Sequence, residues 1–73
     1  MYTLVAASRK NVLDGIVATE RHETLDDAQK VMREWGRFGV QNQCNEADAI
    51  YICDARGRLV SRWDFALKAP VSA

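Results

Sequence analysis

The residues of this chain that could do chemistry fall into three small groups. The first is His22, Glu23 and Asp26, which are close in sequence and of types that can bind a metal ion. His22 is the only histidine, and the three residues come just before or within the start of a predicted helix. Acidic residues at such a position usually form a solvated cap. We therefore expect no metal site and no cofactor here.

The second group is the cysteine pair. Cys44 lies in a polar stretch and Cys53 in a predicted strand, a spacing that matches neither a zinc site nor a disulfide framework. We expect Cys53 to be a small buried apolar side chain and Cys44 a loop thiol. The sequence contains no GxGxxG, no phosphate-binding loop and no HExxH. These observations predict a protein that is not an enzyme.

The third group combines arginines with aromatic residues near the end of the chain. Arg56, Arg58 and Arg62 lie in the run RGRLVSR, and Tyr51 and Trp63 flank it; Arg9 and Lys10 are expected nearby. Cations beside aromatic rings are typical of single-stranded nucleic-acid binding, which is one alternative for this segment. However, the ten basic residues are balanced by ten acidic ones, and a neutral chain lacks the field that drives such binding. The charge balance therefore favours a protein partner over nucleic acid.

Length and hydropathy limit the class of protein. A chain of 73 residues with 48% hydrophobic residues predicts one small domain. We place this domain at residues 1–65, and residues 66–73, which contain a proline and few apolar anchors, are predicted to be a flexible tail. No apolar run approaches ~20 residues and no signal-peptide pattern opens the sequence, so we expect a cytoplasmic protein with no membrane partner.

The first half of the sequence predicts two strands and a helix. The strands cover residues 2–7 and 16–21. They are joined either by a tight turn at Asp14-Gly15, with Leu13 opposite Ile16 and Arg9 opposite Glu20, or by a longer loop over residues 8–15. A helix of about 13 residues follows, capped by Thr24, and Gly36 and Gly39 are both candidates for its end. Its apolar stripe consists of Leu25, Ala28, Val31, Met32 and Trp35.

The second half predicts a hairpin with two apolar faces. Residues 54–57 fit a type I turn followed by a glycine bulge, which places Cys53 opposite Leu59, Ile52 opposite Val60, Tyr51 opposite Ser61 and Ile50 opposite Arg62. In this register one face carries Ile50, Ile52 and Val60. The other face carries Tyr51, Cys53, Leu59 and Trp63. A four-residue loop without the bulge would change the pairing.

The order of elements predicts an α+β fold, β-β-α-β-β, with one helix on one face of a four-stranded antiparallel sheet. Since one helix covers one face, the other is left with Tyr51, Leu59 and Trp63, and we take Arg56, Arg58 and Arg62 as its rim. An uncovered apolar patch of this kind predicts a partner-binding surface, for another protein or for a second copy in a homodimer. The alternative is that Trp63 folds over the sheet edge and the tail covers the rest.

The layout of a capped helix, TLDDAQKVMREW, and a closing hairpin, AIYICDARGRLVSRW, resembles that of small phage-encoded anti-CRISPR proteins. The likeness is one of architecture and spans most of the chain, but it includes no shared motif, so no functional residue is carried over from the family. The layout is also similar to that of many bacterial α+β proteins. The resemblance implies a stoichiometric inhibitor that docks on a multi-subunit host complex and blocks its access to DNA. The near-zero net charge differs from that of acidic DNA mimics.

Overall fold

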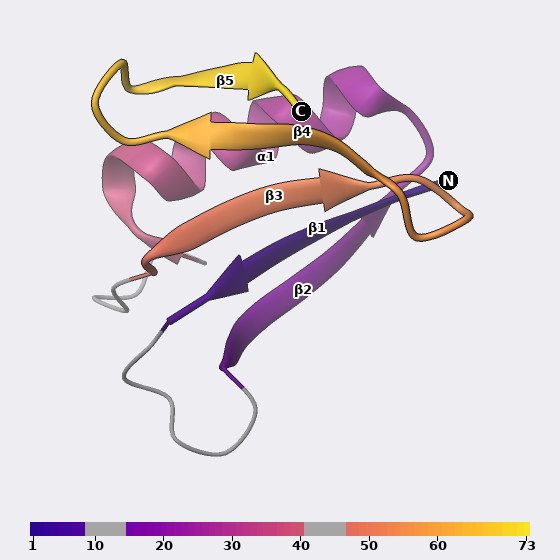
Figure 1. Ribbon diagram of the computed structural model, residues 1–73, viewed down its shortest axis with the longest axis horizontal. Coiled ribbons are helices and arrows are strands. Elements are labelled where there is room, and N and C mark those ends of the chain that lie inside the picture. Colours follow the sequence, from indigo (N-terminus) through magenta and orange to yellow (C-terminus); the bar gives the residue numbers. More distant parts are fainter. Residues whose placement is uncertain (9–14, 41–46) are drawn as a thin grey trace.

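The protein folds into one five-stranded antiparallel sheet with a single helix against one face (Figure 1). This computed structural model describes residues 1–8, 15–40 and 47–73. The elements are β1 (Tyr2–Ala7), β2 (Ile16–His22), α1 (Leu25–Phe38), β3 (Ala49–Cys53), β4 (Leu59–Asp64) and β5 (Ala69–Ser72). The strand order is β2-β1-β3-β4-β5, so β3 is the central strand. We call the face against α1 the inner face and the opposite one the outer face.

The predicted α+β class is confirmed, but the predicted number of strands is wrong. The structure has a fifth strand, β5, within the segment expected to be a flexible tail. It pairs antiparallel with β4, from Ser61 opposite Ser72 to Asp64 opposite Ala69. The C-terminal segment therefore extends the sheet along its edge and does not fold across either face.

The helix follows its local sequence signals. The Thr24 hydroxyl accepts a hydrogen bond from the Asp27 backbone N–H at 3.2 Å, as expected for an N-cap. The helix continues through Gly36 and ends at Gly39, whose φ of 99° is one that glycine adopts readily. The predicted apolar stripe is confirmed: Ala28, Met32 and Trp35 are buried, and Leu25 and Val31 pack partly buried beside them. On the sheet, this stripe meets Leu4, Ala6, Ile50 and Ile52.

The first hairpin takes the longer of the two predicted connections. Ile16 lies opposite Ala7 and Glu20 lies opposite Leu4; Leu13 and Arg9, the partners predicted for them, lie outside the described residues. The Ser8 N–H donates to the Gly15 carbonyl at 2.7 Å and closes the ladder. The proposed turn residue Asp14 lies outside the described residues.

The second hairpin contains a bulge that the sequence did not predict. Cys53 lies opposite Leu59 as expected, but Ile52 lies opposite Ser61 and Tyr51 opposite Arg62. Val60 is thus an extra residue in β4, and every later side chain of that strand changes face. Trp63, predicted on the outer face with Tyr51, instead lies on the inner face and is only 3% exposed.

Glycine on the helix makes room for the indole of Trp63. A Cβ atom built on Gly36 would lie 2.6 Å from Trp63 Nε1 and closer still to two carbons of the ring. The indole therefore packs directly on the helix backbone. Ser61, also turned inward by the bulge, is 1% exposed; its hydroxyl donates to the Val71 carbonyl at 3.2 Å and accepts from Gln29 Nε2 at 3.5 Å. Both inward side chains of β4 are thereby accommodated.

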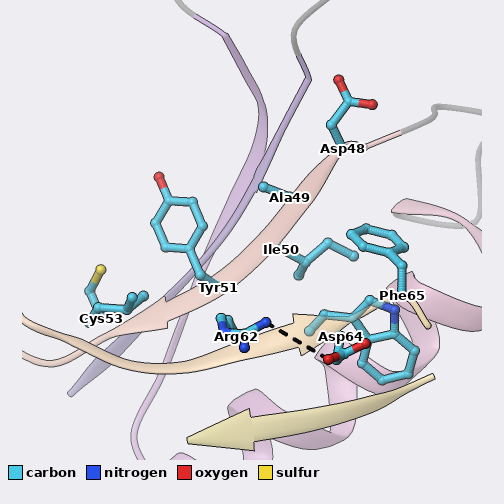
Figure 2. A pocket seen from close by; sticks show the side chains of 10 residues that line it. Asp48, Ala49, Ile50, Tyr51, Cys53, Arg62, Asp64 and Phe65 are labelled. Atoms are coloured by element: carbon cyan, nitrogen blue, oxygen red, sulfur yellow. Dashed lines mark ion pairs between the residues drawn. The ribbon is translucent and has the colours of Figure 1, made fainter. Parts of the chain in front are cut away.

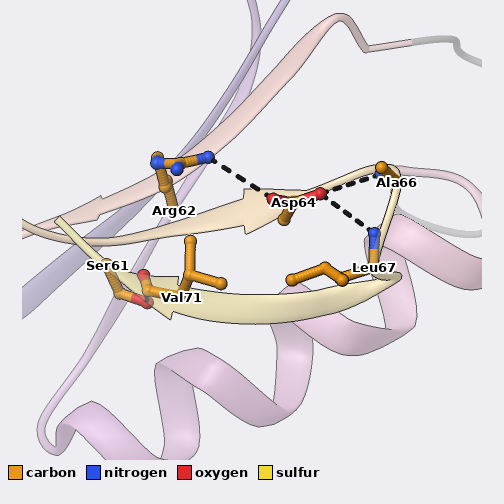
Figure 3. A network of polar contacts seen from close by, with 6 residues as sticks. All are labelled: Ser61, Arg62, Asp64, Ala66, Leu67 and Val71. Carbon is orange, nitrogen blue, oxygen red and sulfur yellow. Dashed lines mark hydrogen bonds and ion pairs between the residues drawn. The ribbon is translucent and has the colours of Figure 1, made fainter.

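The turn into β5 is built around one carboxylate (Figure 3). Asp64 Oδ1 accepts hydrogen bonds from the backbone N–H groups of Ala66 and Leu67, both at 2.9 Å. The Lys68 N–H donates to the Asp64 carbonyl at 2.7 Å, and Lys68 takes a positive φ of 55°. The side chain of Asp64 thus fixes the direction in which the chain returns along β4.

We expect Asp64→Ala to lower the free energy of unfolding by about 1 kcal/mol, the usual cost of losing an Asp that caps backbone N–H groups. Asp64→Asn keeps an acceptor oxygen and is expected to lose less than half of that amount. Urea denaturation followed by circular dichroism measures both. Equal losses for the two variants would show that the charge of Asp64, and not its hydrogen bonds, stabilises the turn.

Candidate partner-binding site

The candidate site is the outer face of the sheet, over which no described helix or strand packs (Figure 1). Tyr51 lies at the middle of the central strand, with Val5 opposite it on β1 and Arg62 opposite it on β4. Residues that face each other across a sheet share a face, so these three side chains form the centre of the outer face. Leu59 and Phe65 lie nearer its two ends and are 48% and 46% exposed.

A hollow opens in this face because β3 and β4 separate at one end. Their ladder stops at Tyr51 opposite Arg62. Beyond that pair, β3 continues beside β1 as far as Ala49, while β4 continues beside β5 as far as Asp64. The resulting β3–β4 hollow measures about 570 Å³ (Figure 2), a volume within the range of ligand pockets. It is lined by Asp48, Ala49, Ile50, Tyr51, Cys53, Leu59, Arg62, Trp63, Asp64 and Phe65.

Two charged side chains of the hollow, Asp64 and Arg62, differ in how many of their polar atoms already have a partner. Asp64 Oδ1 already accepts the two turn N–H groups, and its Oδ2 lies 4.0 Å from Arg62 Nη1. That distance is long for an ion pair, and the Arg62 side chain is 53% exposed. Among the described residues, Asp64 is the one ion-pair or hydrogen-bond partner of the Arg62 side chain. Arg62 is therefore a cation that a partner can reach.

Phe65 separates this hollow from a smaller one of about 320 Å³ at the end of the helix. Ile50, Asp48 and Phe65 line both, while Gly36 and Gly39 line only the smaller one. Trp63 Nε1 is buried and has no hydrogen-bond partner among the described residues. Buried N–H groups are normally paired. The unpaired donor therefore lowers the stability of the fold, and the packing of the indole against α1 offsets this loss.

The structure brings together some of the predicted site residues and separates others. Tyr51, Leu59 and Arg62 all line the hollow. Arg56 and Arg58 lie in the β3–β4 turn at the opposite end of the hairpin from Asp48 and Asp64. Trp63 reaches the hollow only from the inner side, because it belongs to the core. It is too buried to stack on a base, which removes one of the two rings of the nucleic-acid hypothesis.

Phe65 is the site residue that the sequence analysis missed. It stands one residue past the end of β4, where the predicted domain ended. The strand periodicity of Trp63 and Asp64 does not assign Phe65 to either face of the sheet, since Phe65 lies in the turn after β4. The available signal was its residue type, because aromatic residues, phenylalanine included, are enriched at protein interfaces.

The described residues were also compared with what a metal site, a reactive thiol or a membrane span requires. Across residues 1–8, 15–40 and 47–73, no three His, Cys, Asp or Glu side chains are grouped so as to hold a metal ion. Cys53 is a free thiol, half-buried on the outer face, and so is less buried than expected; Cys44 lies outside the described ranges. Within those same ranges, α1 is too short and too polar to cross a membrane.

Comparison with protein-family models, curated proteins and solved structures found no match to this chain.

Proposed function

We propose that this protein is a non-enzymatic binding module whose outer face docks onto a partner protein. The observation that carries the proposal is the β3–β4 hollow, which opens where these two strands separate on a sheet face that no described element covers. Its lining joins the apolar side chains of Leu59 and Phe65 with Tyr51 and Arg62, and tyrosine and arginine are residue types enriched at binding hot spots.

The energetics support docking of an apolar group. Leu59 and Phe65 are each about half exposed, and burying such surface contributes roughly 25 cal/mol per Å². The hollow already excludes part of the solvent around them, so an inserted side chain would bury area on several sides at once. A partner that fills the hollow and pairs with Arg62 gains both affinity and orientation.

We further propose that the partner is a multi-subunit host complex and that binding inhibits it. This finer proposal comes from the resemblance in layout to phage-encoded anti-CRISPR proteins. The balanced net charge of zero supports recognition of a protein surface over mimicry of DNA.

A capture experiment with matched variants tests the docking proposal. We expect tagged wild-type protein to enrich a defined set of subunits from bacterial lysate, and Leu59→Asp to lose them because a carboxylate would be forced into the hollow. Phe38→Asp is the control, since Phe38 is the most exposed large apolar residue in the described part of the chain but lies at the end of the helix. Quantitative mass spectrometry provides the measurement. Capture that survives Leu59→Asp, or that is lost equally in Phe38→Asp, would exclude the outer face as the docking site.

A further inference from the structure

We draw no further inference here: the strongest candidate, the β3–β4 hollow in the outer face of the sheet, belongs to the site already described, and nothing in the structure of residues 1–8, 15–40 and 47–73 shows what covers it.

Discussion

Replacing Trp63 by alanine is expected to lower the free energy of unfolding by about 3–5 kcal/mol. The indole is 3% exposed and belongs to the core cluster with Met32, Trp35 and Ile50, so its removal leaves a large cavity that the rigid sheet cannot close. A domain of this length has a total stability of about the same size. The variant should therefore be largely unfolded at 25 °C, as measured by far-ultraviolet circular dichroism and urea denaturation.

Phe38→Ala provides the matched control for this result. Phe38 is 74% exposed at the end of α1, so truncating it should change stability by less than about 0.5 kcal/mol. If Trp63→Ala were tolerated as well as Phe38→Ala, the indole would have to lie on the outer face, in the register without the bulge at Val60. The comparison thus tests the register as well as the core. It also shows why Trp63→Ala is unsuitable as a probe of partner binding.

The parts of the fold that the sequence predicts are those with local causes. The helix begins at Thr24 because that side chain caps it, and its buried face follows from the three- and four-residue spacing of Ala28, Met32 and Trp35. The faces of β3 follow from strict alternation, which puts Ile50 and Ile52 inward and Tyr51 outward. Tyr51 could therefore be assigned to the site from its position alone.

The face of Trp63 could not be predicted from local pattern. A hairpin with or without an extra residue at Val60 satisfies the same turn signal at Asp54 and Gly57. A residue distant in sequence decides between these two registers. Gly36, which has no side chain, leaves room on α1 for the indole of Trp63. In the sequence Gly36 is a candidate helix end, whereas in the structure it accommodates a side chain 27 positions later in the chain.

The fifth strand was missed for a related reason. Residues 69–72 are few and include Pro70, which has no N–H to donate, so the segment lacks a strand signal of its own. It is held instead by Asp64 at its turn and by Ser61 Oγ, which donates to the Val71 carbonyl. Both contacts depend on the orientation that the bulge gives to β4. Because the predicted β3–β4 register was wrong by one residue, neither β5 nor the part of the hollow formed by Phe65 could be predicted.

Gly36→Ala is expected to destabilise the protein by about 1–3 kcal/mol, although alanine is the better helix former by about 1 kcal/mol. The reason is steric: the new Cβ would lie 2.6 Å from Trp63 Nε1, far inside van der Waals contact, and the indole has no space to retreat within the core. Glu34→Ala, an exposed change on the same helix, should be close to neutral. Urea midpoints of the two variants give the comparison.

The origin of this loss can be isolated by repeating the substitution where the indole is absent. In a Trp63→Leu background the ring that meets the new methyl group is gone, so Gly36→Ala should become neutral or stabilising through helix propensity. The two changes are then expected to be coupled by more than about 1 kcal/mol, which is characteristic of residues in direct contact. If Gly36→Ala cost the same in both backgrounds, the close packing of Trp63 on α1 would be wrong, and with it the bulged register that makes Arg62 part of the outer face.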